Sequence, residues 1–286
     1  MLRRCKRLWQ PMPCAHAVLA VVNSVLRNRV YTALGLAGLT LATIFLAPLW
    51  LFGLIFGIAA SIGAYEWAAF AGWTDKKQRL QYVGALWVVG IVGITQAEYW
   101  PQFIVGVCVL WLLGFISILL HPKFSWIYRK PWFVAVLGWT LMLCAWLCLV
   151  TLFQQEHGHW WLLWLFVLTT ATDVGAFFAG RAFGQHALAP KVSPAKTREG
   201  AAGGTTLALI ICAGGLFLAG AVDFYTAIGL TLVMSLISIL GDLFESLLKR
   251  VSGVKDSGDI LPGHGGVLDR IDSIVAVLPF LVWSIA

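Results

Sequence analysis

Apolar residues fill most of the chain in long runs that short polar segments interrupt. A helix needs about 17–25 apolar residues to cross the hydrocarbon core of a bilayer, because its backbone groups must be satisfied within the segment. We therefore predict an all-α, polytopic integral membrane protein with about nine transmembrane helices. The predicted spans are about 30–47, 48–71, 82–97, 101–120, 132–153, 160–180, 201–221, 223–246 and 268–286.

Composition supports this fold class. The 286 residues are 60% hydrophobic and 12% charged, whereas soluble domains are about half apolar and about a quarter charged. If the N-terminus is cytoplasmic, all 20 Lys and Arg fall on the cytoplasmic side, as the positive-inside rule requires. The loops "QAEYW" and "QQEHGHW" on the other side contain none. The net charge of +7 thus indicates topology, and we expect no nucleic-acid partner.

Polar residues divide the chain unevenly. Residues 1–24 form an N-terminal extension, which is either an interfacial segment or the product of a misassigned start codon. Residues 25–155 contain little polar material within the spans beyond Glu66, so we interpret them as a membrane scaffold. Residues 156–286 contain two long loops rich in Lys, Ser, Gly and Pro, and we predict that this part is the catalytic region.

One carboxylate lies inside the predicted span 160–180, where Asp173 occurs in "TTATDVGAFFAG". A charge at this depth costs several kcal/mol unless it is paired, hydrated or bound to a metal ion. A hydrogen bond to the neighbouring threonines would be a structural alternative, but we interpret Asp173 as a functional group that faces a cavity.

Two further groups of carboxylates occur at helix ends. In "SILGDLFESLLKR", Asp242, Glu245 and Lys249 share one helical face; they could simply neutralise each other, but we favour metal binding because charges below the membrane rim are costly. In "HGGVLDRIDS", Asp269 and Asp272 share a face after a glycine-rich turn. A helix N-terminus after such a turn is suited to phosphate, and Lys255, His264 and Arg270 flank it.

The loop "KVSPAKTREGAAGG" adds basic residues on the same side. Ser193 and Pro194 resemble a helix N-cap followed by proline at the first helical position. Lys191, Lys196 and Arg198 could reach phosphate oxygens, or could be ordinary positive-inside residues. Carboxylates for a divalent metal beside cations for phosphate are the groups that phosphoryl or nucleotidyl transfer requires.

Two segments resemble a known family, the phosphatidate cytidylyltransferases or CDP-diacylglycerol synthases. "SLLKRVSGVKDSGDILPGHGGVLDRID" resembles the family signature, and "DVGAFFAGRAFGQHALAPKVSPAKTREG" resembles its upstream stretch. One departure is Arg198, where many relatives have Trp. The matching positions are Asp173, Ser193, Pro194, Lys196, Thr197, Glu199, Gly200, Ser246, Lys249, Arg250, Lys255, Asp256, Pro262, His264, Gly265, Gly266, Asp269, Arg270 and Asp272.

The resemblance implies a reaction in which CMP passes from CTP to phosphatidic acid, giving CDP-diacylglycerol and pyrophosphate. It also implies Mg²⁺ in a two-metal centre, whose second ion could be monovalent. CTP would arrive from the cytosol and phosphatidate from membrane lipid, so the site would face the cytoplasm at the bacterial inner membrane. The sequence leaves open whether the protein forms a homodimer.

The resemblance also assigns roles. We expect Asp242 and Asp269, helped by Asp173 or Glu245, to bind metal. Lys196, Lys249 and Arg270 would hold the triphosphate and the departing pyrophosphate, and His264 would be a donor near the phosphates rather than a base. The catalytic set is Asp242, Asp269, Lys249 and Arg270, and the substrate-binding set is Ser193, Lys196, Thr197, Arg250, Lys255, Asp256, His264, Gly265, Gly266 and Asp272.

Two alternatives compete with this interpretation. An ion- or proton-coupled transporter would suit an intramembrane Asp173, but transporters place polar sites near the midplane between repeats, and no repeat is visible here. A CDP-alcohol phosphotransferase would need an Asp-Gly-x-x-Ala-Arg segment, which this sequence does not contain.

Overall fold

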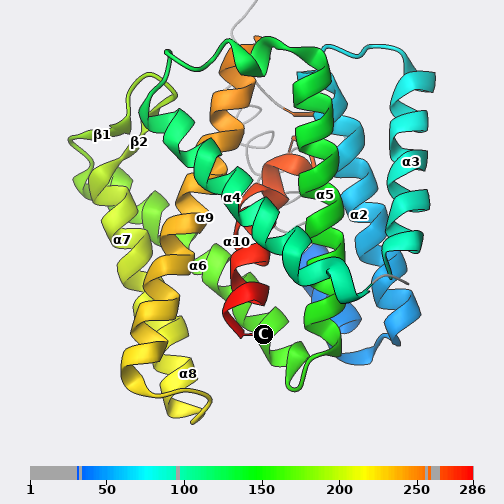
Figure 1. Cartoon of the computed structure of the whole chain (residues 1–286). Coiled ribbons are helices and arrows are strands. Elements are labelled where there is room, and N and C mark those ends of the chain that lie inside the picture. The colour runs from blue at the N-terminus through cyan, green and yellow to red at the C-terminus, as the bar shows by residue number, and fades with distance from the viewer. Residues whose placement is uncertain (1–30, 32–33, 95–96, 255–256, 259–264, 286) are drawn as a thin grey trace, which may run out of the picture.

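The computed structural model describes residues 31, 34–94, 97–254, 257–258 and 265–285, which fold mainly into helices (Figure 1). A short apolar helix, Leu34–Leu46, precedes the labelled elements. These elements are α2 (Leu49–Phe70), α3 (Lys76–Ile94), α4 (Trp100–Leu119), α5 (Pro131–Gln154), α6 (Gly158–Phe183), β1 (Ala187–Ala189), β2 (Ser193–Thr197), α7 (Arg198–Ala208), α8 (Gly214–Leu218), α9 (Phe224–Ser252) and α10 (Leu268–Ile285). Short 3₁₀ turns cover Ala97–Tyr99 and Ile127–Arg129, and a π-helical segment, Leu209–Ala213, joins α7 to α8.

Six helical stretches in the described residues are long and apolar enough to cross a membrane. They are α2, α4, α5, α6, α9 and the continuous stretch Arg198–Leu218. The protein is therefore a helical, polytopic membrane protein. The remaining predicted spans at 30–47, 82–97 and 268–286 each overlap a helix of the described residues, but Leu34–Leu46 is shorter, α3 begins with charged residues, and α10 has three charged residues near its start.

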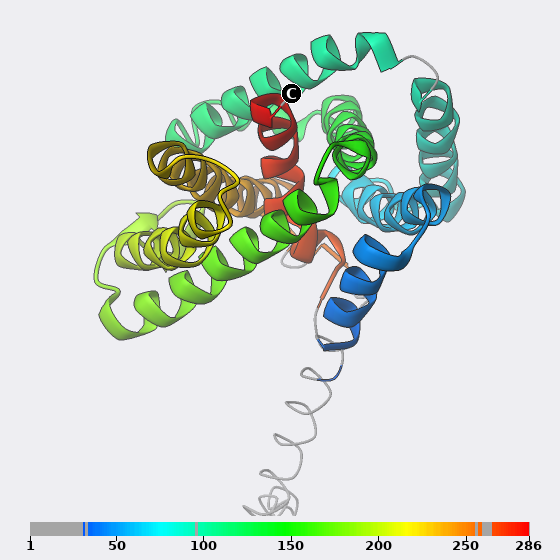
Figure 2. The ribbon, with the colours of Figure 1, turned by 90° about the horizontal axis from the view of Figure 1, so that it is seen from below.

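The last helix, α10, occupies the centre of the bundle. It contacts α2, α4, α5, α6 and α9, and Figure 2 shows it enclosed between them. Most of its apolar side chains are buried, including Val275, Ala276 and Leu281. In the charged first turns of α10, Asp269 and Asp272 are therefore half-buried, whereas Arg270 is exposed.

Small residues let the central helices approach closely. A Cβ on Gly241 of α9 would lie 2.5 Å from the Cβ of Ala276 in α10. A Cβ on Gly203 of α7 would lie 2.1 Å from the Cβ of Ala179 in α6. Close approach of this kind is a common basis of helix packing in membranes, where neighbouring helices gain little from the hydrophobic effect.

The segment between α6 and α7 differs from the prediction. The sequence predicts Ser193 as a helix cap, but this residue lies in β2 and pairs with Ala189 of β1 in an antiparallel hairpin. The N-cap of α7 is Thr197, whose hydroxyl accepts a hydrogen bond of 3.0 Å from Gly200 N. Pro194 fits either arrangement, because a two-stranded hairpin has edges where a missing N–H is tolerated.

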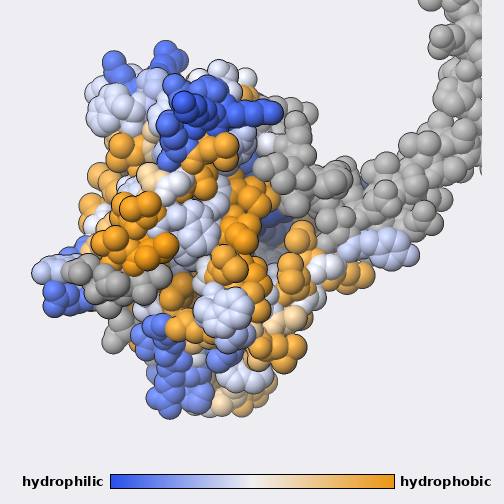
Figure 3. Space-filling view, turned by 90° about the vertical axis from the view of Figure 1, so that its right-hand side faces the viewer, coloured by the Kyte–Doolittle hydropathy of each residue, from blue (hydrophilic) through white to orange (hydrophobic). Residues whose placement is uncertain are grey.

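One face of the molecule shows how polarity is distributed. In Figure 3 hydrophobic residues extend across the middle of this face, and hydrophilic residues gather towards its upper and lower ends. This distribution is expected of a protein with a lipid-facing belt, because apolar side chains favour the hydrocarbon and polar ones the interfaces.

Candidate active site

Three carboxylates meet where α9 and α10 touch. One oxygen each from Asp242, Glu245 and Asp272 can be chosen so that all three lie within 4.8 Å of one another. Gly241 makes this possible, since a side chain there would collide with α10. Glu245 is only 3% exposed, and its Oε1 has no hydrogen-bond partner among the described residues. We refer to Asp242, Glu245 and Asp272 as the carboxylate group.

Two lysines lie against the carboxylate group. Lys249 Nζ donates to Glu245 Oε2 at 2.8 Å and also pairs with Asp269 Oδ1, so one ammonium joins α9 to the first turn of α10. Lys196, from β2, pairs with Asp242. The sequence predicts that these residues act together, and the fold brings them into one place from three separate elements.

The N-terminus of α10 is held by local and distant contacts. Asp269 Oδ2 accepts a hydrogen bond of 2.9 Å from Gly266 N. Gly265 has a φ of +79°, a backbone conformation that glycine adopts at little cost. Asp269 therefore closes the turn and pairs with Lys249, whereas Asp272, one turn further along, belongs to the carboxylate group.

Glu66 of α2 is the distant contact. Its carboxylate accepts hydrogen bonds from Val267 N at 3.1 Å and from Leu268 N at 2.8 Å, with Ser257 Oγ at 3.5 Å. These backbone groups would otherwise be the unsatisfied donors of a helix N-terminus. Glu66 thus acts as a cap supplied by another helix, and its 2% exposure shows that it is enclosed there.

The same carboxylate fixes the shape of the glycine-rich segment. A Cβ on Gly266 would lie 2.6 Å from Glu66 Oε2 and 2.1 Å from Ser257 Oγ. A Cβ on Gly258 would lie 2.4 Å from Glu66 Oε1. The glycines are therefore required for the backbone to pass over Glu66.

Other predicted site residues lie around this centre. Asp173 on α6 is within electrostatic range of Asp242, Lys196 and Arg270. Arg250 uses its Nε to bind Val192 O at 3.2 Å, which ties α9 to the hairpin. The predicted residues Lys255, Asp256 and His264 lie outside the described residues, as do Pro262 and Gly263.

Two residues have a larger part in the site than their sequence context predicts. Glu66 stands out in the sequence only as isolated polar material in the scaffold, although a carboxylate alone in an apolar span is the same signal that marks Asp173. Asp272 is predicted to bind substrate, but it lies with Asp242 and Glu245. The spacing of three residues puts Asp269 and Asp272 on one face of α10. It does not predict that Asp269 pairs with Lys249 while Asp272 lies with Asp242 and Glu245.

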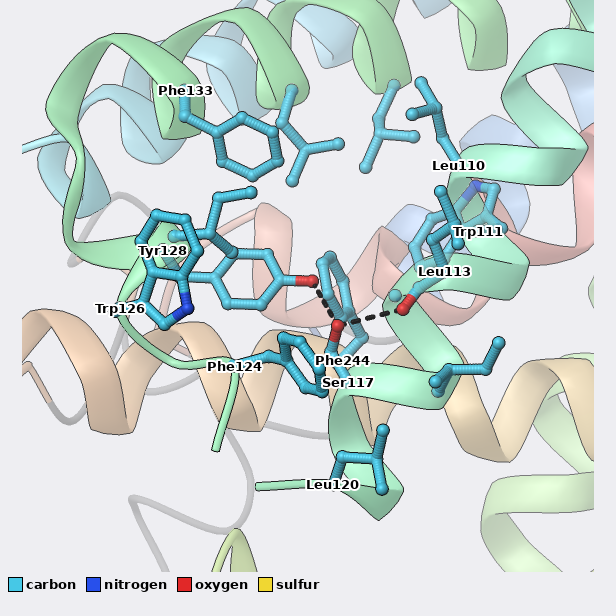
Figure 4. Close-up of a pocket in the computed structure, with 15 residues that line it drawn as sticks. Leu110, Trp111, Leu113, Ser117, Leu120, Phe124, Trp126, Tyr128, Phe133 and Phe244 are labelled. Atoms are coloured by element: carbon cyan, nitrogen blue, oxygen red, sulfur yellow. Dashed lines mark hydrogen bonds between the residues drawn. The ribbon is translucent and has the colours of Figure 1, made fainter. Parts of the chain in front are cut away.

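An apolar pocket lies between α4, α5 and α9, and none of the three residues of the carboxylate group lines it (Figure 4). It has a volume of about 350 Å³ and is lined by residues of α4, α5, α9 and the segment between α4 and α5. Its polar contacts form a chain, in which Tyr128 Oη donates to Ser117 Oγ and Ser117 Oγ donates to Leu113 O, each at 2.9 Å. Burial raises the pKa of Tyr128, so this phenol stays a donor. Phe244, next to Glu245 in sequence, forms part of the lining.

Comparisons with known proteins show the family of this chain. Residues 27–286 match the cytidylyltransferase family. The chain is 36% identical to the phosphatidate cytidylyltransferase of Pseudomonas aeruginosa over 267 residues, covering 91% of this chain and 98% of that protein. It is 34% identical to the phosphatidate cytidylyltransferase of Haemophilus influenzae over 281 residues, covering 90% and 97%.

A shorter match has a higher sequence identity. The phosphatidate cytidylyltransferase of Bacillus subtilis is 43% identical over 133 residues, which is 46% of this chain and 49% of that protein. The two long matches reach well beyond the segments that carry the site residues. The chain therefore belongs to the cytidylyltransferase family, together with the phosphatidate cytidylyltransferases.

Proposed function

We propose that this protein transfers CMP from CTP to phosphatidic acid, giving CDP-diacylglycerol and pyrophosphate. Family membership supports the reaction type, and the observation that carries the proposal is the carboxylate group with its two lysines. Such a site can hold a metal–triphosphate complex. The arrangement of this site does not favour the transporter interpretation. Its charged residues lie together where α9 meets α10, whereas transporters place their polar sites near the midplane between repeats.

The residues present fit a divalent cation. Asp242, Glu245 and Asp272 offer hard oxygen ligands, and Glu245 Oε1 is a buried acceptor without a partner among the described residues. Mg²⁺ favours a few carboxylates together with substrate phosphates. When bound, it would neutralise charge on the triphosphate. We propose that this group holds Mg²⁺, with Asp269 and Asp173 beside it as further ligands or as the site of a second ion.

The basic residues have a separate task. Lys249 and Lys196 are ion-paired with carboxylates in the structure, so both are already positioned beside the metal-binding oxygens. Ammonium groups can transfer such pairing to phosphate oxygens. Together with Arg270 on the first turn of α10, we assign them to holding the triphosphate and the departing pyrophosphate.

The chemical step needs little proton transfer. An oxygen of the phosphatidate monoester attacks the α-phosphorus of CTP, and the bond from that phosphorus to the oxygen bridging the α- and β-phosphates breaks. A phosphate monoester has its second pKa near about 6, so it is largely ionised at neutral pH. The chain therefore has to position the two substrates and oppose their charge, and it needs no strong general base.

Topology supports a cytoplasmic site in the bacterial inner membrane. The first turn of α3, the segment between α4 and α5 and the segment between α6 and α7 contain Lys and Arg, whereas residues 97–99, 155–157 and 219–223 contain none. By the positive-inside rule the first set is cytoplasmic. We propose nine spans with a cytoplasmic N-terminus. This fold is compatible with a homodimer.

Transfer of radiolabelled CMP from CTP to lipid tests the proposal. Purified full-length protein in detergent is given Mg²⁺, dioleoyl phosphatidic acid and α-³²P-labelled CTP, and label is followed into the chloroform phase. We expect lipid-soluble label that depends on phosphatidate and Mg²⁺ and is lost in Asp242→Asn, but not in Glu98→Gln, which changes an exposed carboxylate of the 3₁₀ turn Ala97–Tyr99. Wild-type turnover of Asp242→Asn at saturating Mg²⁺ would contradict the metal assignment.

A further inference from the structure

A second cleft lies between the end of α4, the β1–β2 hairpin and one face of α9. Its volume is about 480 Å³, within the range of about 300–1,000 Å³ that is usual for ligand pockets. None of Asp242, Glu245 and Asp272 lines it, so it is separate from the carboxylate group. Its apolar lining includes Ile118, Leu188, Leu236, Ile239, Leu240 and Leu243.

The lining is aliphatic and its α9 face is open. Leu236 is 47% exposed, whereas Leu243 is buried at the base of the same face. No Phe, Tyr or Trp side chain lines the cleft among the residues that the structure describes, so it lacks the large flat surfaces on which nucleotide bases most often stack. A flexible hydrocarbon chain suits such a surface better than a base or a peptide backbone, which would leave polar groups unsatisfied.

The polar residues of this cleft are basic. Lys191 and His121 line it, and no carboxylate of the described chain does. Lys191 is exposed, and among the described residues it has no ion-pair partner, in contrast to Lys196 and Lys249, which are both paired. An exposed ammonium beside an apolar lining is complementary to a molecule with an anionic head and an apolar tail.

His121 and Lys191 come from different loops but act on each other. The pKa of His121 lies below its ordinary value, first because of burial and then because the Lys191 ammonium is close. The ring is held by a hydrogen bond of 2.7 Å between its Nδ1 and Ser125 Oγ. Two nitrogen groups are therefore available at the same end of the cleft, where α4 ends and the chain leaves the apolar layer.

We propose that this cleft binds an anionic glycerophospholipid, with its phosphate at Lys191 and His121 and an acyl chain along the α9 face from Leu236 to Leu243. The proposal does not depend on cytidylyl transfer. It has a consequence for the site, because the same hairpin carries Lys191 at the cleft and Lys196 at Asp242.

Lipid binding to the intact protein provides the test. Full-length protein, delipidated in a neutral detergent, is titrated with dioleoyl phosphatidylglycerol or dioleoyl phosphatidylcholine, and bound lipid is counted by native mass spectrometry. We expect one tight phosphatidylglycerol that is weakened about five-fold in Lys191→Gln, the effect of one lysine at an anionic surface. Lys123→Gln removes a lysine from the same loop as His121 without touching the cleft, and should bind as wild type.

Two further variants separate lipid in this cleft from lipid at the carboxylate group. Leu236→Trp fills the exposed side of the cleft and should reduce binding with little change in melting temperature. Lys196→Gln should leave binding unchanged. The proposal is overturned if Lys123→Gln weakens binding as much as Lys191→Gln, if phosphatidylcholine binds equally well, or if only Lys196→Gln weakens binding, which would place the lipid at the carboxylate group.

Discussion

Replacement of Glu66 gives the sharpest test of how the site is held together. Glu66 lies on α2, yet its two carboxylate oxygens accept the hydrogen bonds of Val267 N and Leu268 N at the start of α10. We predict that Glu66→Ala and Glu66→Gln both lower stability and turnover, although neither touches the carboxylate group.

The magnitude follows from the donors left behind. Each buried N–H without a partner costs about 1–3 kcal/mol, so Glu66→Ala, which frees two, should cost roughly 2–6 kcal/mol. Glu66→Gln keeps one oxygen acceptor and presents an NH₂ group to the other N–H, so about half this loss is expected. The amide also removes the favourable interaction of a negative charge with a helix N-terminus, worth about 0.3–1 kcal/mol.

The effect on activity follows from position. Asp269 and Asp272 lie in the first two turns of α10, so a shift of this terminus moves both. A displacement of about 1 Å in a reacting constellation can cost about 100-fold in rate. We expect a fall in kcat of about 10- to 100-fold for Glu66→Ala and a smaller one for Glu66→Gln.

Thermal unfolding in detergent and transfer of labelled CMP measure the two effects. Glu98→Gln is the matched control, because Glu98 is exposed and should leave both values unchanged. If Glu66→Gln kept the wild-type melting temperature and turnover, the inter-helix cap would be unimportant and the reasoning refuted.

Three other predictions concern α9 and α10. Gly241→Ala should cost about 1–3 kcal/mol by overpacking and reduce turnover, whereas Gly229→Ala, with open space around its Cβ, should be neutral or stabilising; equal melting temperatures would contradict the close helix contact. Asp272→Asn should raise the Mg²⁺ concentration for half-maximal activity more than Asp269→Asn, and the reverse order would reassign the ligands. Asp223→Ala should lower the melting temperature at neutral pH. Hydrogen bonding, chiefly from a neighbouring threonine hydroxyl, depresses the pKa of Asp223 below 3.8, so the difference should persist down to that pH and shrink as the pH falls through the depressed value; a constant difference would argue against this cap.

Hydropathy predicts the positions of the helices well because crossing a bilayer leaves few options for the backbone. The predicted span 132–153 corresponds to Pro131–Gln154, and 101–120 to Trp100–Leu119. The end of α9 is less predictable: it continues to Ser252, past the apolar run, because Lys249 finds partners inside the protein.

The candidate site is predictable as a set of residues but not as a set of contacts. Residue type and depth indicate the carboxylates and lysines. The contact between Glu66 and Leu268 spans 202 positions in sequence, and no local pattern encodes it. Likewise, "SPAKT" is compatible with a helix start or an edge strand, and pairing with Ala187–Ala189 decides in favour of the strand.

The central place of α10 has a consequence for biogenesis. This helix is the last described element to be synthesised, yet it contacts α2, α4, α5, α6 and α9. Its first turns bring Asp269, Arg270 and Asp272 towards the bilayer, where such charges are costly without partners. The helices that surround α10 all precede it in the chain, so Glu66 of α2 and Lys249 of α9 are synthesised before the residues that they contact. A nascent chain halted before α10 would lack Asp269 and Asp272 and the helix that fills the centre of the bundle.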